Sequence, residues 1–152
     1  MAQQLLLLNG PNLNLLGSRE PAVYGSGTLA DIESAAKAQA EAAGATLSCF
    51  QSNHEGALID RIHAARAEGV DFIVINPGGL TQYSVSLHDC IKAMPFPVIE
   101  VHLSNLATRE EWRHHSIISP AVKGTVQGLG WRSYTAALRT LVETVREPKK
   151  PS

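Results

Sequence analysis

Short apolar runs alternate along the chain with segments whose apolar residues recur at helical spacing. The runs are rich in Leu, Ile and Val and lack the alternation of apolar and polar positions that marks a strand with one exposed face. Such runs are typical of parallel strands that are buried on both faces. We therefore predict five strands, at residues 4–8, 45–51, 70–75, 97–103 and 122–127.

The segments between these runs carry start and stop signals for helices. Thr28 and Asp31 have the spacing of a capping box, which predicts the start of the first helix. Thr108 and Glu111 have the same spacing and predict a short helix late in the chain. The other predicted boundaries are Gly44 and Gly69 at the ends of the first two helices, 84–94 for the third helix and 133–145 for the last.

Strands that alternate with helices indicate an α/β fold with right-handed crossovers. We predict a flavodoxin-like, doubly wound architecture, in which a five-stranded parallel sheet carries helices on both faces. A chain of 152 residues fits one domain, which we assign to residues 1–146. Residues 147–152 are polar and rich in proline, and we expect them to form a disordered tail.

The charge of the chain is nearly balanced, with a formal net charge of -1. This balance gives no basic surface for nucleic acid or for an anionic membrane, so we expect small molecules and copies of the same chain as partners. No apolar stretch approaches the ~20 residues of a membrane span, and the run at 5–8 is too short for a signal peptide. Cys49 and Cys90 are isolated and are expected to be free thiols in the core. We expect a cytoplasmic protein.

Polar residues follow three of the predicted strands. Asn9 and Asn12 follow the first strand, Asn76 follows the third, and Glu100 and His102 end the fourth. In a sheet of this kind ligands bind beyond the carboxyl ends of the strands, so these residues should converge on one rim. Glu100 and His102 share a face, where the carboxylate can fix the imidazole tautomer and suit the histidine to proton donation. A histidine that is hydrogen-bonded for structure alone is the alternative.

The loop after the first strand carries a cation and a phenol between glycines. Arg19 and Tyr24 lie within the segment that runs from Gly17 to Gly25. A guanidinium within hydrogen-bonding reach favours the ionised form of a phenol, so the two residues are candidates for a general base. An ordinary surface loop with a packed tyrosine is the alternative on this segment alone.

Two arginines and two backbone amides suggest a site for an anionic or hydroxyl-rich ligand. Arg109 and Arg113 would lie one turn apart near the start of a helix, a position that favours anions. The amides of Leu103 and Ser104, in the turn after the fourth strand, would suit a carboxylate. Solvated surface arginines remain the alternative. Trp112 and Trp131 are expected to be packing residues.

The sequence gives no signal for a metal or a cofactor. His114 and His115 are adjacent, and the other histidines lack acidic or cysteine partners at the spacing of metal ligands. The chain also has no Walker-type phosphate loop and no dinucleotide fingerprint. We therefore predict no metal and no cofactor.

Taken together, these segments resemble the type II 3-dehydroquinate dehydratases over nearly the whole chain. The resemblance implies loss of water from 3-dehydroquinate to give 3-dehydroshikimate through an enolate, in the shikimate pathway or in quinate catabolism. It also implies a homododecamer assembled from trimers. The motifs that carry the resemblance are Asn9-Gly-Pro-Asn12, Gly17 to Gly25, Gln51-Ser-Asn53, Asn76-Pro-Gly-Gly79, Glu100-Val-His102-Leu-Ser104-Asn105 and Arg109-Glu-Glu-Trp-Arg113-His-His-Ser116.

The resemblance assigns a role to each catalytic candidate. Tyr24 would take the proton beside the ketone, with Arg19 on the same loop holding it as phenolate. Asn12, through a bound water, would stabilise the enolate. His102, oriented by Glu100, would protonate the departing hydroxyl. The resemblance also implies a set of residues that bind the substrate, and Asp89 among them would reach the site of a neighbouring subunit. These residues are Asn76, Gln82, Asp89, Leu103, Ser104 and Arg113.

Gln82 departs from the family pattern, because the family commonly has a histidine at this position. A glutamine amide can donate and accept hydrogen bonds but cannot carry a proton or a positive charge, so the departure affects substrate binding more than catalysis. Two further readings stay open. One is a paralogue that acts on another hydroxylated cyclic acid, and the other is a flavodoxin-like protein that binds a metabolite without catalysis.

Overall fold

The computed structural model describes residues 2–18, 20, 22 and 27–146. Five strands form one sheet in the order β2-β1-β3-β4-β5, and every neighbouring pair is parallel. This is the flavodoxin-like order, so the predicted fold class is confirmed. The strands are β1 Gln3–Asn9, β2 Ala45–Gln51, β3 Phe72–Asn76, β4 Val98–His102 and β5 Gly124–Gln127.

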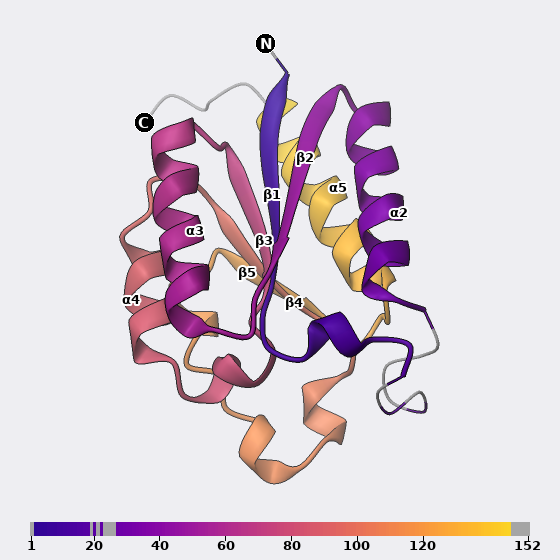
Figure 1. Cartoon of the computed structure of the whole chain (residues 1–152), viewed down its shortest axis with the longest axis vertical. Coiled ribbons are helices and arrows are strands. Elements are labelled where there is room, and N and C mark those ends of the chain that lie inside the picture. Colours follow the sequence, from indigo (N-terminus) through magenta and orange to yellow (C-terminus); the bar gives the residue numbers. More distant parts are fainter. Residues whose placement is uncertain (1, 19, 21, 23–26, 147–152) are drawn as a thin grey trace.

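Two pairs of helices cover the sheet (Figure 1). Helices α2 (Leu29–Ala42) and α5 (Arg132–Arg146) lie on one face, and α3 (Glu55–Glu68) and α4 (Val85–Lys92) lie on the other. Successive residues of a strand point to opposite faces, so β1 contributes to two separate cores. Those cores contain Leu5 and Leu7 on the side of α2 and α5, and Leu6 and Leu8 on the side of α3 and α4.

The capping box predicted at the start of α2 is confirmed. The Thr28 hydroxyl accepts a hydrogen bond from the backbone N–H of Asp31 at 3.2 Å, and the Asp31 carboxylate accepts one from the N–H of Thr28 at 3.0 Å. These bonds lower the pKa of the Asp31 carboxyl below its ordinary value. Gly44 and Gly69 follow the first two helices with φ of 78° and 76°, a conformation that glycine adopts without strain.

The helix predicted from Thr108 and Glu111 is wrong. The structure has two short 3₁₀ turns instead, η3 (Leu106–Thr108) and η4 (Glu111–Arg113). The side chain of Asn105 accepts a hydrogen bond from the backbone N–H of Ala107 at 3.2 Å, so the first turn begins earlier and Thr108 ends it. The other 3₁₀ turns are η1 (Leu13–Leu15), η2 (Gly78–Gln82) and η5 (Ser119–Ala121).

The tryptophans differ from the prediction and the cysteines agree with it. Trp112, in η4, is 63% exposed, and Trp131, directly before α5, is 43% exposed. Cys90 is buried and Cys49 is partly buried against the core, and both are free thiols. Burial raises the pKa of the Cys49 thiol to about 11. Within the described residues, no helix is both long enough and apolar enough to cross a membrane.

Candidate active site

The carboxyl ends of β1 and β3 are joined backbone to backbone. The N–H of Gly10 donates a hydrogen bond to the Asn76 carbonyl at 2.8 Å. A Cβ on Gly10 would lie 2.4 Å from the Pro77 carbonyl oxygen, and a Cβ on Gly78 would lie 2.9 Å from the Pro11 carbonyl oxygen. Glycine at these two positions therefore allows the loops to touch, and the contact gives the site a fixed base.

A buried network fixes the side chain of Asn76. The Asn76 amide donates a hydrogen bond to the Tyr134 hydroxyl at 2.8 Å, and this hydroxyl donates to the Asn9 side-chain oxygen at 2.6 Å. The N–H of Gly78 donates to the Asn76 side-chain oxygen at 3.1 Å. Burial raises the pKa of Tyr134, which keeps it a neutral phenol at neutral pH. An amide nitrogen carries two hydrogens, so Asn76 holds its orientation and can still offer one hydrogen to a ligand.

Glu100 and His102 form a buried pair at the end of β4. The Glu100 side chain is 1% exposed and the His102 side chain is 8% exposed, and His102 Nε2 is hydrogen-bonded to Glu100 Oε2. The Ser119 hydroxyl donates to Glu100 Oε1 at 2.7 Å, and the Ser116 hydroxyl donates to Oε2 at 3.3 Å. The carboxylate thus has three hydrogen-bond partners, His102, Ser119 and Ser116. It orients the imidazole with Nε2 toward Glu100, which leaves Nδ1 as the ring nitrogen that a ligand could contact.

Asn12 lies on the η1 side of the same rim. Its backbone is left-handed, with φ of 69°, and its side chain is exposed. The N–H of Asn12 donates a hydrogen bond to the side-chain oxygen of Asn53 at 3.0 Å, and its carbonyl accepts one from Leu15 at 3.0 Å. Asn53 belongs to one of the sequence motifs named above, but no role was predicted for it from the sequence.

Gln82 lies beside the backbone of Arg113. The Gln82 amide nitrogen donates to the Arg113 carbonyl at 3.3 Å, whereas its amide oxygen is buried and has no hydrogen-bond partner among the described residues. The Arg113 guanidinium donates to Glu110 at 2.6 Å and lies 4.1 Å from the centre of the Trp112 ring. The pKa of Glu110 is lowered by its own backbone N–H and by Arg113.

The remaining predicted site residues occupy different positions. Ser104 accepts a hydrogen bond from the Arg109 guanidinium at 3.0 Å, and Leu103 is buried beside it. Asp89 is exposed on α4 and, within the described part of the chain, makes no hydrogen bond or ion pair with the other predicted site residues. Arg19 and Tyr24 lie outside the described residues. Arg109 and Arg113 each end a 3₁₀ turn, so the predicted helix start that both would share does not exist.

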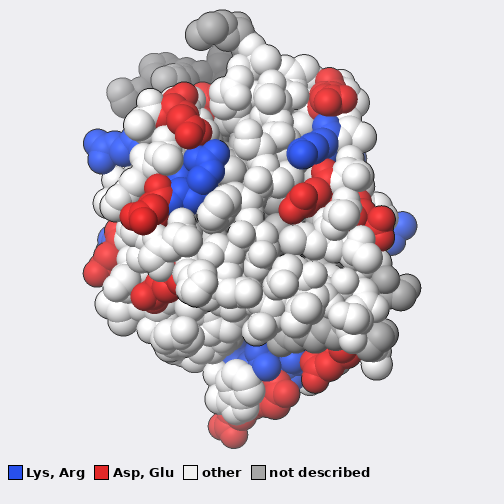
Figure 2. Space-filling model, in the orientation of Figure 1, with Lys and Arg blue, Asp and Glu red and all other residues white. Residues whose placement is uncertain are grey.

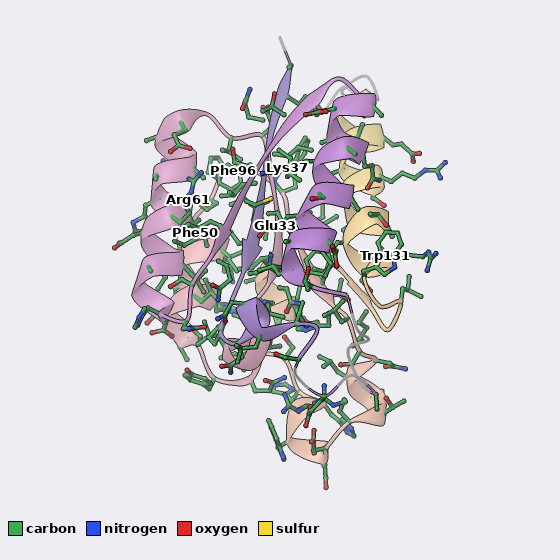
Figure 3. The ribbon with its side chains drawn as sticks, turned by 45° about the vertical axis from the view of Figure 1, so that its right-hand side comes forward. Glu33, Lys37, Phe50, Arg61, Phe96 and Trp131 are labelled. Atoms are coloured by element: carbon green, nitrogen blue, oxygen red, sulfur yellow. The ribbon has the colours of Figure 1, made fainter. Side chains whose placement is uncertain are left out.

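Two cavities flank the end of β4. One of about 860 Å³ lies between α2 and the residues after β4, and Trp131, labelled beside α5 in Figure 3, lines it. The other, of about 380 Å³, is lined by the Glu100–His102 pair and, from the β5 edge, by Thr125 and Gln127. No group of three or more His, Cys, Asp or Glu side chains within the described ranges is placed to hold a metal ion.

The end of the molecule that carries η3 and η4 has charges of both signs. Figure 2 shows acidic and basic side chains side by side at the lower end, where Figure 1 places η3 and η4. Glu110 lies 3.7 Å from Arg109 and 2.6 Å from Arg113, so opposite charges neighbour each other there. The site therefore offers specific polar groups to a small ligand rather than a broad field of one sign.

The chain is similar to known proteins over most of its length. The model of the family "Dehydroquinase class II" matches residues 3–142. The 3-dehydroquinate dehydratase of Herminiimonas arsenicoxydans is 62% identical over 138 residues, which are 91% of this chain and 95% of the relative. The catabolic 3-dehydroquinase 1 of Aspergillus terreus is 53% identical over 150 residues, which are 99% of this chain and 98% of the relative.

A solved structure agrees with these sequence comparisons. The crystal structure of the type II dehydroquinase from Butyrivibrio crossotus superposes with a TM-score of 0.91 at 40% identity. The match covers 92% of this chain and 97% of that protein. The fold, the polar rim of the sheet and the sequence similarity agree: the chain belongs to the class II dehydroquinase family.

Proposed function

We propose that this protein is a 3-dehydroquinate dehydratase, a hydro-lyase that removes water from 3-dehydroquinate to give 3-dehydroshikimate. The observation that carries the proposal is the buried Glu100–His102 pair at the carboxyl end of β4, in a chain of this family. A carboxylate-oriented imidazole in a polar rim is suited to donate a proton to a leaving hydroxyl. Packing alone gives little physical reason to bury such a pair there.

The proposed reaction has two steps that balance in protons and electrons. The Tyr24 phenolate, paired with Arg19, takes a proton from the carbon beside the ketone, and the electron pair moves to the ketone oxygen as an enolate. Asn12, acting through a water, stabilises this oxyanion. The enolate then collapses to the conjugated ketone and expels the hydroxyl, which leaves as water with a proton from His102. The proton that Tyr24 took then returns to His102 through solvent, which restores both residues for the next turnover. Because Nε2 faces Glu100, Nδ1 of His102 delivers that proton.

Binding of the substrate is proposed for residues around this pair. The free hydrogen of the Asn76 amide and the buried oxygen of Gln82 are suited to the ring hydroxyls. The amides of Leu103 and Ser104 and the guanidinium of Arg113 are suited to the carboxylate and its neighbours. The position of Asp89 on the surface of α4 allows it to reach a neighbouring subunit.

We also propose an assembly, a cellular location and a metabolic role for the protein. The assembly is a homododecamer built from trimers, in line with the family resemblance. The two free cysteines, Cys49 and Cys90, favour the reducing cytoplasm. The same dehydration serves aromatic biosynthesis and quinate breakdown. One relative is named a 3-dehydroquinate dehydratase and another a catabolic 3-dehydroquinase, so both roles fit this chain.

Ultraviolet absorbance tests the reaction directly, because the product is a conjugated enone acid. Wild-type protein with 3-dehydroquinate and no added metal or cofactor should give a rising signal. Tyr24→Phe should lower the rate by about 100-fold or more, because it removes the base. Tyr83→Phe removes the same hydroxyl from a tyrosine that is 66% exposed and serves as the matched control.

Each outcome of this assay bears on one proposal. No signal from assembled wild-type protein would overturn the proposed reaction and favour another hydroxylated cyclic acid as substrate, or binding without catalysis. A signal that is equal in wild type and Tyr24→Phe would leave the reaction standing and remove Tyr24 as its base.

A further inference from the structure

The loop between β2 and α3 contacts the site through Asn53. The side-chain oxygen of Asn53 accepts the backbone N–H of Asn12 at 3.0 Å, across 41 residues of sequence. The proposed catalytic and binding roles leave the Gln51-Ser-Asn53 motif without a function. We propose that Asn53, supported by Gln51, is a positioning residue that fixes Asn12 for stabilisation of the enolate.

The backbone of Asn12 has a conformation that its neighbours hold in place. Its φ of 69° and ψ of -3° place it in the left-handed region, which is uncommon for residues with a side chain, although asparagine adopts it more readily than most. A conformation of this kind persists where surrounding contacts hold it. Asn53 holds the N–H of Asn12 and Leu15 holds its carbonyl, at 3.0 Å each, so both peptide groups are fixed. The direction in which the exposed Asn12 side chain leaves the backbone is fixed with them.

Gln51 anchors the acceptor itself. Its amide nitrogen donates to the Asn53 side-chain oxygen at 3.2 Å and to the Gly10 carbonyl at 3.2 Å. Gln51 ends β2 directly beside Asn9 in the sheet register, and the N–H of Ser52 donates to the Asn9 carbonyl at 3.1 Å. The end of β2 is therefore tied to the chain on both sides of Pro11, and Asn53 is held where the Asn12 N–H points.

This inference rests on the proposed role of Asn12. An oxyanion is stabilised by donors that are already in place when the charge develops. A shift of about 1 Å in the position of such a donor can lower the catalytic rate by about 100-fold. Binding of the substrate in the ground state need not change. Loss of Asn53 should therefore lower kcat and leave KM nearly unchanged.

A double-mutant cycle between Asn12 and Asn53 tests the inference in the full-length, assembled protein. Asn12→Ala should lower kcat strongly, and Asn53→Ala should lower it by about tenfold or more with KM within about twofold. If Asn53 acts through Asn12, the double variant should be no slower than Asn12→Ala alone. Independent action would instead multiply the two losses, and that result would overturn the inference.

Asp71→Ala is the matched control for general loss of stability. Asp71 also accepts a backbone N–H, that of Gln4 at 2.8 Å, but at the amino ends of the strands. This variant should lower the unfolding midpoint and leave kcat unchanged. Equal losses of kcat in Asp71→Ala and Asn53→Ala would also overturn the inference.

Three other outcomes of these experiments have separate meanings. If Asn53→Ala is not recovered as assembled protein, Gln51→Met replaces it in the double-mutant cycle with Asn12→Ala. Gln51→Met keeps the side-chain length and removes the amide hydrogen bonds to Gly10, Asn14 and Asn53. An active wild type with an unaffected Asn12→Ala would overturn the role of Asn12 and this inference together. An inactive wild type would overturn the proposed function itself.

Discussion

Gln82 shows how one residue can alter substrate binding without altering the proposed proton transfers. Its amide nitrogen is already committed to the Arg113 carbonyl at 3.3 Å, and its buried oxygen has no partner among the described residues. A buried acceptor without a partner is costly, so a substrate hydroxyl that donates to it would be favoured. The residue is thus equipped to accept a hydrogen bond but not to carry the charge of the histidine expected for the family.

We predict that Gln82→His improves kcat/KM for 3-dehydroquinate by about 3- to 10-fold, the equivalent of one hydrogen bond of ~1 kcal/mol. Most of the change should lie in KM, because Gln82 takes no part in the proposed proton transfers. Steady-state kinetics measure the effect. Gln82→Leu, which removes the acceptor at similar volume, should change kcat/KM in the opposite direction. An unchanged value in Gln82→His would contradict the assigned binding role.

At the level of elements, two segments with the same capping spacing fold differently. Thr28 and Asp31 begin a 14-residue helix whose Ile32, Ala36 and Ala40 are buried against the sheet. Residues 106–113 have no buried position, so no packing energy supports a full helix there. Capping residues therefore predict a helix reliably where an apolar stripe follows them, and the second segment lacked that stripe.

The cap of α2 gives a prediction about stability. Thr28→Ala should lower the free energy of unfolding by about 1 kcal/mol, because the N–H of Asp31 loses its acceptor at the start of the helix. Urea denaturation followed by circular dichroism measures the change. Thr140→Ala, which removes an exposed hydroxyl inside α5, is the control and should change stability less. Equal midpoints for wild type and Thr28→Ala would contradict the prediction.

The same cap should respond to acid. The pKa of Asp31 is lower in the folded state than its ordinary value of 3.8, so the charged carboxyl stabilises the fold. This contribution is fully present above pH 3.8 and is lost as the pH falls through the lowered value. In Asp31→Asn, which cannot titrate, this part of the acid dependence should be absent from the unfolding curves.

At the level of the whole molecule, the sequence predicted what depends on local pattern. Buried parallel strands and helix signals identified all five strands of the sheet, and the strand-end rule brought Asn76, Glu100 and His102 to one rim. The sequence did not predict the hydrogen-bond partners that other parts of the chain supply to these residues. Tyr134 contacts Asn9 across 125 residues, and Ser119 contacts Glu100 across 19. Such contacts depend on how helices and loops dock, which no local periodicity encodes.

At the level of the assembly, Asp89 allows a test of whether each site is shared between two subunits. Its exposure on α4 allows contact with another subunit. In the assembly proposed above, a site would take His102 from one chain and Asp89 from the next. Asp89→Ala and His102→Ala should each be nearly inactive alone. Co-assembled at equal amounts, they should recover about a quarter of wild-type activity, because random mixing pairs intact residues at that fraction of interfaces. Separately assembled variants, mixed without subunit exchange, are the control. Hybrids that form without regaining activity would show that Asp89 serves its own subunit or none.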